Sequence, residues 1–524
     1  ETLLVMLNSM PLNMRQKLFV RLLPAASILI FFCCISLAKA DNILLVIADD
    51  FGVDAAGVYN SDDLYGHNGE GASPAHTPTI DSLAASGVLF RNAYTNPICS
   101  PTRATILTGK YPHQIGVGWP AEAQLDVSET IIPEMLPSAY QSAAIGKWHL
   151  THPSRGPTAD KNHPINSGFD YFSGSLGGGV QDYNSWPKLT NSINTSPLIQ
   201  NNYSIYATTD AANETIAKIQ EYADQPWFIW LAFNAPHSPF HAPDSALTTN
   251  DVTASSSNTD KYKAMVEALD TELGRIIASM PADVLADTTI IFIGDNGTPS
   301  EVTQAPFLSN HAKATQYDGG TNVPFIVRSP SFISAINEGS ESLAYINTID
   351  IFNTIAEIAG VSNSATESAT ESVSIVPYLQ SPSLPTLTKR PYIFTEHFSP
   401  NGFGPYTNHQ RSMHLEGWKL IWRDDVYQEF YDLSNDPYET NNLLPVANFT
   451  AEALAVYEQL VCAFEAIDTL ESADPADITD PSTCMPPATE NVPAMPFLLM
   501  LLLSGLLAGI SIKKANDWQR QSPL

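Results

Sequence analysis

Cys99 stands at the head of the segment CSPTRATILTGKYPH, four residues before Arg103. Pro101 favours the first turn of a helix, so this spacing predicts that Cys99 and Arg103 lie together at a helix N-terminus. The free backbone N–H groups and the dipole of such an end attract anions. The segment therefore predicts a turn that combines a thiol, a guanidinium and an anion-binding helix end.

Acidic and amide side chains follow two apolar runs that are typical of buried strands. Asp49 and Asp50 follow NILLVIA, and Asp295 and Asn296 follow TTIIFIG. Adjacent carboxylates are costly to bury unless a cation neutralises them. Carboxylate and amide oxygens suit a hard divalent cation, Ca²⁺ or Mg²⁺, better than zinc. Either pair alone is a weak signal because Asp and Asn also cap helices, but the repeated pattern indicates a metal site.

Basic side chains occur at the ends of similar runs. Lys147 and His149 follow SAAIG, His237 follows PWFIWLAFNAP, and Lys313 precedes TQYDGG. Each one alone is best explained as a surface charge or, for a histidine, as a buried hydrogen-bonding group. Together with the cation site and the helix end, they indicate a pocket for a negatively charged oxyanion ester.

The elements that must position these residues predict an α/β fold. The expected strands lie within residues 42–52, 142–150, 226–243, 288–297 and 323–330, and the expected helices are 78–86, 206–222 and 260–280. Continuous apolar runs alternating with helices predict a large, mostly parallel central sheet sandwiched by helices. Ligands of such folds bind beyond the carboxyl ends of the strands, where the polar clusters fall.

Two further segments differ from this pattern in periodicity or composition. After about residue 391 apolar and polar residues alternate with a period of two, which predicts a smaller C-terminal subdomain built on an antiparallel sheet. Residues 173–202 are rich in Asn, Ser and Gly, and we expect a long surface excursion there.

Both ends of the chain carry apolar segments. Basic residues precede an apolar run that ends in Ala-Lys-Ala at 38–40, which is typical of a cleaved signal segment. Met14 is an alternative start of the protein. The alternative interpretation of the apolar run is an uncleaved anchor helix. The run 496–512 has about the length of a short membrane span and is followed by two lysines. The predicted divisions are a signal segment (1–40), a catalytic domain (41–390), the C-terminal subdomain (391–470), a Pro-rich acidic linker (471–495) and an apolar anchor or sorting tail (496–524). We therefore expect export to the periplasm, the cell surface or the medium.

Charge and cysteine content narrow the function further. The 524 residues include 55 acidic and 25 basic ones, and this formal net charge of −30 argues against nucleic acid as a partner. Of the five cysteines, Cys33 and Cys34 fall in the signal segment, and Cys462 and Cys484 are close enough in sequence to form a disulfide. Cys99 is left over, which indicates intermolecular pairing, a reactive thiol or a modified residue.

The segment CSPTR with ATILTGKYPH after it resembles the signature of the type I sulfatases, the formylglycine-dependent branch of the alkaline phosphatase superfamily. The resemblance continues in NILLVIADDFG, GKWHL, NAPHSPFHAP, GDNG, KATQYDGGTNVPFIVRSP and GWKLIW…EFYDLSNDPYETNNL, in the order of the family. One departure is Gly294, where the family more often has serine. The resemblance implies that a maturation enzyme converts Cys99 to Cα-formylglycine, whose hydrate is the nucleophile.

The resemblance also implies roles for the remaining residues. The cation, in this family usually one calcium ion, is assigned to Asp49, Asp50, Asp295, Asn296 and the modified Cys99. Arg103 is expected to steady the modified side chain, and Lys147 to bridge it and the sulfate. His149 is the expected base that allows sulfate to leave, and His237 and Lys313 are expected to bind sulfate, one of them protonating the leaving oxygen.

The substrate expected from the resemblance is a sulfate ester, of a sulfated oligo- or polysaccharide or an aryl alcohol. Two alternatives remain open: a phosphonate or phosphate monoester hydrolase on the same scaffold, and an inactive surface protein that binds sulfated glycans. Segments expected to face a sugar are 173–202, the region of Trp119, and 397–409. Trp119, Tyr183 and Trp186 are aromatic candidates within them, although ordinary packing explains each one better. Membrane or sorting machinery is a further expected partner of the C-terminal tail.

Overall fold

The computed structural model describes residues 41–60, 73–151, 160–361, 370–386, 390, 392–424 and 427–471. The expected signal segment, the apolar C-terminal run and nearly all of the linker lie outside these residues. Among the described residues, no helix combines the length and the apolar character that a membrane span needs. Cys462 is disulfide-bonded, while Cys484, its expected partner, is outside the described part of the chain.

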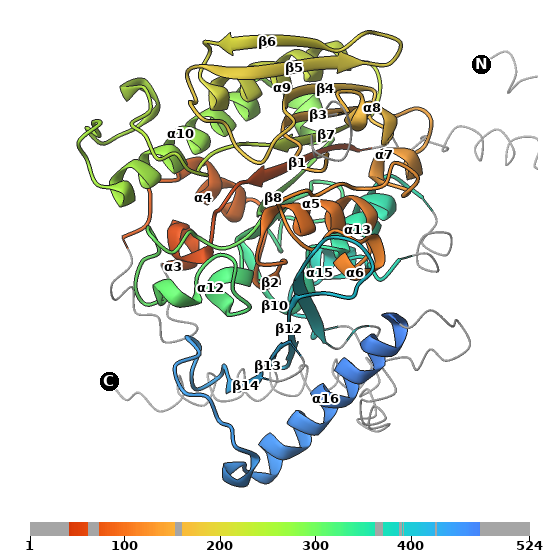
Figure 1. Cartoon of the computed structure of the whole chain (residues 1–524). Helices are drawn as coiled ribbons and strands as arrows, with labels where there is room; N and C mark the ends of the chain where they lie inside the picture. The colour runs from red at the N-terminus through yellow and green to blue at the C-terminus, as the bar shows by residue number, and fades with distance from the viewer. Residues whose placement is uncertain are drawn as a thin grey trace, which may run out of the picture. The chain divides into compact units, whose positions relative to one another are not determined.

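A ten-stranded mixed sheet forms the centre of the predicted domain over residues 41–390 (Figure 1). Its middle is parallel, with β8, β1, β7, β3 and β4 adjacent in that order. Across the sheet the strands are β10 (Ser340–Asn347), β2 (Val88–Tyr94), β9 (Phe325–Arg328), β8 (Thr288–Gly294), β1 (Asn42–Ala48), β7 (Trp227–Ala232), β3 (Gln141–Lys147), β4 (Tyr171–Ser175), β5 (Trp186–Ser192) and β6 (Leu198–Tyr203). The predicted α/β fold with a large central sheet is confirmed.

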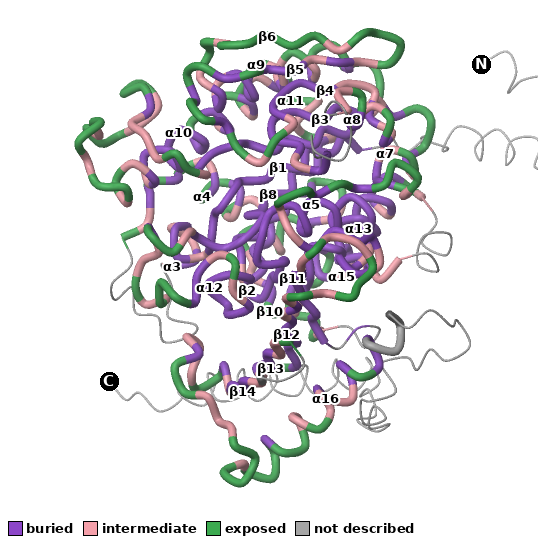
Figure 2. The backbone as a smooth tube through the Cα atoms, viewed as in Figure 1, coloured by how far each residue is buried: buried purple, intermediate pink, exposed green. Residues whose placement is uncertain are grey.

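Helices cover both faces of this sheet because the central strands are apolar on both sides. In β1, Ile43, Leu45 and Ile47 join one buried cluster, while Leu44 and Val46 join the other. The first cluster includes residues of α5 (Cys99–Thr108), α13 (Asp350–Ile358) and α15 (Val376–Gln380), and the second includes residues of α4 (Pro78–Ala85), α9 (Ala207–Glu221) and α10 (Asn258–Ser279). Figures 1 and 2 show the two helical layers and the buried core between them.

Shorter helices connect these elements. They are α3 (Gly57–Asn60), α6 (Pro112–Ile115), α7 (Ile132–Met135), α8 (His163–Asn166), α11 (Ala282–Ala286) and α12 (Asp318–Thr321), with 3₁₀ turns at Val53–Ala55, Ser245–Leu247, Ser309–His311 and Val446–Asn448. The predicted helices at 78–86, 206–222 and 260–280 correspond to α4, α9 and α10.

The expectation for residues 173–202 is wrong for most of that segment. It contains the end of β4 and then β5 and β6, which extend the sheet by antiparallel pairing. All but the last residue of β6 are exposed, so this edge strand lacks the apolar pattern that sequence analysis relies on.

A second sheet, as predicted, is antiparallel and C-terminal. It consists of β11 (Ile393–Ser399), β12 (Asn408–Leu415), β13 (Trp418–Arg423) and β14 (Tyr427–Asp432). The helix α16 (Ala451–Glu471) follows, and a separate compact unit begins within it, at Ala455.

A buried ion network ties this second sheet to α12. Lys419 of β13 lies with its Nζ 2.7 Å from Asp318 Oδ1 and 2.6 Å from Glu439 Oε1. The Asp318 carboxylate also accepts a hydrogen bond from His414 Nε2 at 3.0 Å. The Lys419 side chain is fully buried, and among the described residues Asp318 and Glu439 compensate its charge.

Replacing this lysine with an apolar residue of similar length tests the network. We expect Lys419→Met to lower the free energy of unfolding by about 3–5 kcal/mol, because the Asp318 carboxylate then remains buried without its counter-charge. Lys110, whose ion pair with Glu129 is partly exposed, provides the control: Lys110→Met should cost at most about 1 kcal/mol. Urea unfolding of both variants measures the difference, and equal losses would show that the buried network contributes no more than the exposed pair.

Candidate active site

The parallel centre of the sheet brings the polar clusters to one edge. Because β8, β1, β7 and β3 are neighbours and parallel, their carboxyl ends point the same way. Asp49 and Asp50 follow β1, His237 follows β7, Lys147 ends β3 with His149 two residues later, and Asp295 and Asn296 follow β8.

Cys99 reaches the same edge from β2. This strand leads into an extended residue, Ile98, and α5 begins at Cys99, as the sequence predicts. All ten residues of α5 are buried, and the helix ends where Gly109 adopts a left-handed conformation with φ 68°. The Cys99 Sγ lies 3.3 Å from His149 Nδ1. Burial raises the pKa of the Cys99 thiol, while Lys147 and Lys313 act in the opposite direction.

Arg103 joins three of the strand ends. Its Nε and one terminal nitrogen donate to Asp295 Oδ2 at 3.0 and 2.8 Å, and its other terminal nitrogen donates to the Lys147 carbonyl oxygen at 2.9 Å. The guanidinium is also 3.9 Å from Asp49 Oδ1. Arg103 is fully buried, so it holds α5 against the carboxylates.

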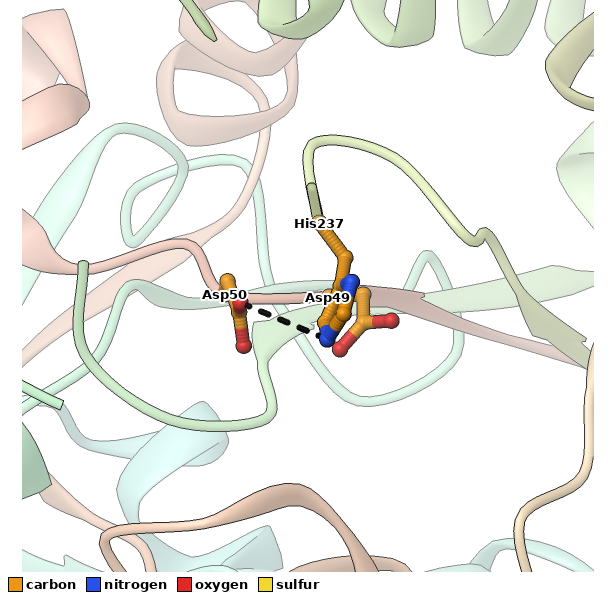
Figure 3. A group of neighbouring side chains, drawn as sticks. All are labelled: Asp49, Asp50 and His237. Carbon is orange, nitrogen blue, oxygen red and sulfur yellow. Dashed lines mark ion pairs between the residues drawn. The ribbon is translucent and has the colours of Figure 1, made fainter. Parts of the chain in front are cut away.

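Ion pairs compensate the other carboxylates. Lys147 Nζ lies 2.6 Å from Asp49 Oδ2, and Lys313 Nζ lies 2.5 Å from Asp50 Oδ1. His237 Nε2 is 3.9 Å from Asp50 Oδ2, the contact drawn in Figure 3. The ligand atoms of Asp49, Asp50 and His237 all lie within 4.8 Å of one another.

The oxygen set fits a hard divalent cation. Asp49 Oδ1 and Asn296 Oδ1 are buried, and neither has a hydrogen-bond partner among the described residues. Asn296 Nδ2 donates to Asp50 Oδ1 at 2.9 Å, so the amide is oriented with its oxygen available. Buried oxygens without donors are costly, and oxygen ligands of this kind are those that Ca²⁺ binds.

The buried charges shift the pKa values of the site in different directions. Burial raises the pKa of Asp49 to about 6. Burial also acts to raise the pKa of Asp50, but Lys313, His237 and Lys147 together outweigh burial and hold that pKa well below its usual range. Burial, reinforced by Lys147 and Arg103, lowers the pKa of His149 well below 6.5. His149 is therefore neutral near pH 7 and able to accept a proton.

Two site residues have strained backbones. Asp50 has φ 69° and His149 has φ 62°, both in the left-handed region that L side chains rarely adopt. Asp295 Oδ1 accepts a hydrogen bond from the Asp50 N–H at 3.0 Å, and the Tyr262 hydroxyl donates to the Asp50 carbonyl at 2.7 Å. Tyr262 could not be recognised as a site residue from the sequence, because it lies within an amphipathic helix, where a tyrosine is typical of core packing.

Gly294 has a steric explanation in this chain. A Cβ built on it would lie 2.0 Å from the carbonyl oxygen of Phe51. The backbone beyond β1 therefore approaches the end of β8 too closely for any side chain there.

The aromatic residues named from sequence have mainly structural contacts. Tyr183 is buried and its hydroxyl lies 2.6 Å from the carbonyl oxygens of both Asn234 and His237. Trp186 is buried and donates from Nε1 to the Ile205 carbonyl at 3.0 Å. Neither is available to stack on a sugar. Trp119 is partly exposed, and its ring centroid is 5.8 Å from that of His397.

Fold and site together define an α/β protein with a cation- and anion-binding centre at the carboxyl edge of its sheet. Residues 41–361 match the family model Sulfatase, and residues 310–464 match the model N-sulphoglucosamine sulphohydrolase, C-terminal. The first match covers more than half of the chain, and the chain belongs to the sulfatase family, within the alkaline phosphatase superfamily.

Individual relatives agree with this assignment. The chain is 30% identical to N-acetylgalactosamine-6-sulfatase from Homo sapiens over 360 residues, which are 61% of this chain and 62% of that protein. It is 27% identical to an ulvan-active sulfatase from Formosa agariphila over 71% of this chain and 73% of that protein. The crystal structure of Ps i-CgsB in complex with k-i-k-neocarrahexaose shares the fold, with a TM-score of 0.66, 22% identity, and coverage of 86% of this chain and 100% of that one.

The hydrogen bond from Tyr262 generates a prediction about the carboxylate cluster. We expect Tyr262→Phe to weaken calcium binding about 10-fold, since the Asp50 backbone then loses the donor that holds its strained conformation. Tyr140 is the matched control, because its hydroxyl donates at 2.7 Å to the Asp41 carbonyl, just before the opposite end of β1. Both variants should lose about 1 kcal/mol of stability, but Tyr140→Phe should bind calcium normally. Calcium titration by calorimetry distinguishes them, and equal affinities would contradict a role for Tyr262 in the site.

Proposed function

We propose that the protein is an exported sulfatase that hydrolyses sulfate esters of a carbohydrate. The observation that carries the proposal is the buried nucleophile turn, in which Cys99 lies 3.3 Å from a histidine and opens a helix pinned by Arg103 to the carboxylate cluster. All ten residues that the family motif assigns to the reaction meet at this edge of the sheet. A family whose members act on sulfate esters supplies the reaction class.

Residue 99 is proposed to act as Cα-formylglycine, with its hydrate as the nucleophile. One hydroxyl of the hydrate would lose its proton and bond to sulfur through its oxygen, while the bond between sulfur and the ester oxygen breaks and the ester oxygen gains a proton to release the alcohol. The second hydroxyl then loses its proton, the bond between residue 99 and the sulfate oxygen breaks, and the aldehyde is restored as sulfate leaves. The second hydroxyl supplies the release step that a serine ester would lack.

The surrounding residues supply the proton transfers and the positive charge. His149 accepts the proton of the second hydroxyl, because it is neutral and its Nδ1 faces residue 99. Arg103 fixes the start of α5, and Lys147 and Lys313 provide ammonium groups for the sulfate oxygens. Lys313 or His237, which border Asp50, protonates the leaving oxygen.

Asp49, Asp50, Asp295 and Asn296 would hold a calcium ion. When bound, the ion supplies a Lewis acid that favours the ionised nucleophile and polarises a sulfate oxygen. The two buried oxygens without hydrogen-bond partners are the support for this assignment.

The carbohydrate class is supported by the relatives. N-acetylgalactosamine-6-sulfatase and the ulvan-active sulfatase are named for carbohydrate substrates, and Ps i-CgsB was crystallised with a neocarrahexaose. Export is proposed on the strength of the signal-like segment at residues 1–40, and it would give the enzyme access to polymers outside the cell.

The decisive test combines the state of residue 99 with turnover. We expect protein from the native host to show a loss of about 18 Da at Cys99, the change from thiol to aldehyde, and to release sulfate from sulfated oligosaccharides. Cys99→Ala should abolish turnover. If the protein cleaves phosphonate or phosphate esters faster than sulfate esters, it is a phosphonate or phosphate ester hydrolase instead. If residue 99 remains a thiol and the protein binds glycans without cleaving them, it is an inactive binding protein.

Calcium dependence is tested separately from turnover. We expect calcium at 100 times its dissociation constant to raise the free energy of unfolding by about 2.7 kcal/mol, and a chelator to remove both this gain and the activity. Asp50→Asn should lose the calcium-dependent gain. Asp270 is a buried control carboxylate that accepts hydrogen bonds from the start of α4, and Asp270→Asn should keep the gain. A calcium response that survives in Asp50→Asn would place the ion elsewhere.

A further inference from the structure

Three consecutive glycines follow β4 and border the site. Gly177 and Gly179 are exposed, and Gly178 is partly buried. None of the three has a φ in the left-handed region, so backbone conformation does not demand glycine here. The space around their Cα atoms is the other feature that can require glycine at these positions.

Gly178 lies directly against His149. A Cβ built on Gly178 would be 2.4 Å from both Cε1 and Nε2 of the His149 ring, a distance that real Cβ atoms essentially never show. These two atoms form the Cε1–Nε2 edge of the imidazole, and Nδ1, which is bonded to Cε1, faces Cys99 Sγ. The bare Cα of Gly178 therefore borders the ring next to the nitrogen that faces Cys99.

The same segment also fixes the backbone on which the ring is carried. The His149 N–H donates to the Leu176 carbonyl at 3.1 Å, and the Trp148 N–H donates to the Ser175 carbonyl at 2.9 Å. With φ 62°, His149 has a strained backbone that these bonds help to hold. The ring and the backbone of His149 are thus both set by residues 175–178.

Gly179 has a weaker contact of the same kind. A Cβ on it would lie 3.3 Å from Cε1 and Nδ1 of His237. That is tight but leaves room for a small adjustment, since the His237 side chain is 23% exposed. Gly177 differs from both, because a Cβ on it would meet no atom of the described residues within 4 Å.

We propose that Gly178 is a positioning residue that sets the plane of the His149 ring, so that Nδ1 faces residue 99, and that Gly179 restrains His237 less strictly. This inference rests on the proposed function, in which His149 moves the proton that releases sulfate. A side chain at residue 178 would displace the imidazole from its position beside residue 99 while leaving the sulfate-binding lysines in place.

Three alanine variants test the proposal through kinetics. Gly178→Ala should lower kcat about 100-fold with little change in KM, since misplacing a catalytic group by about 1 Å has an effect of this size. Gly179→Ala should have a smaller effect, and Gly177→Ala should match the wild type. Equal kinetics for Gly177→Ala and Gly178→Ala would overturn the proposal.

A thermal double-mutant cycle tests the contact without relying on turnover. Gly178→Ala should lower Tm in the wild-type background but not in a His149→Ala background, where the ring that the new methyl group meets is gone. The same loss of Tm in both backgrounds would overturn the proposed contact. If the wild-type protein releases no sulfate from any ester, the proposed function fails, and the cycle alone still decides whether Gly178 positions His149.

Discussion

Burial of charge is the constraint on which the rest of the structure depends. Asp49, Asp50 and Asp295 are each at most 2% exposed and lie at the ends of neighbouring strands. Carboxylates so placed would be strongly destabilising without counter-charges. Arg103, Lys147 and Lys313 provide three positive charges against the three negative ones. A divalent cation would make this balanced set positive by two charges, which suits an anionic ester and the negative charge that develops as sulfate is transferred.

The C-terminal sheet braces the turn that carries Cys99 against this charged edge. The Glu396 N–H of β11 donates to Asn96 Oδ1 at 3.1 Å, three residues before Cys99. The Glu396 carboxylate in turn joins His113, just beyond α5, to His409 of β12, at 2.7 and 2.9 Å. The segment that contains Cys99 is thus held by the second sheet both before and after α5.

The residues of the site could be predicted because their neighbours in sequence are strands. A buried parallel strand reads as a continuous apolar run, so the polar residues after residue 48 and residue 294 were visible as strand ends. Strand order could not be predicted in the same way. β9 is antiparallel to both β2 and β8, and nothing in a four-residue apolar strand records its direction.

The strand β6 and the role of Gly178 could not be predicted, because their local sequence fits more than one structure. Most of β6 is exposed, so this edge strand contains Asn and Gln residues that are also typical of a loop. Gly178 is one of 28 glycines, and only the position of a distant imidazole distinguishes it from Gly177. A sequence pattern shows which residues share an element, whereas contacts between elements depend on packing that no local pattern encodes.

The overall charge of the protein and the charge of its site have opposite consequences for an anionic substrate. A net charge of −30 repels sulfated polymers at long range. In physiological salt, however, this repulsion between exposed charges is screened beyond about 8 Å. Arg103 and Lys147 are buried and Lys313 is only partly exposed, so their charges are screened much less. Under the proposed function, recognition of the ester is therefore decided by these charges within the site and not by the acidic surface.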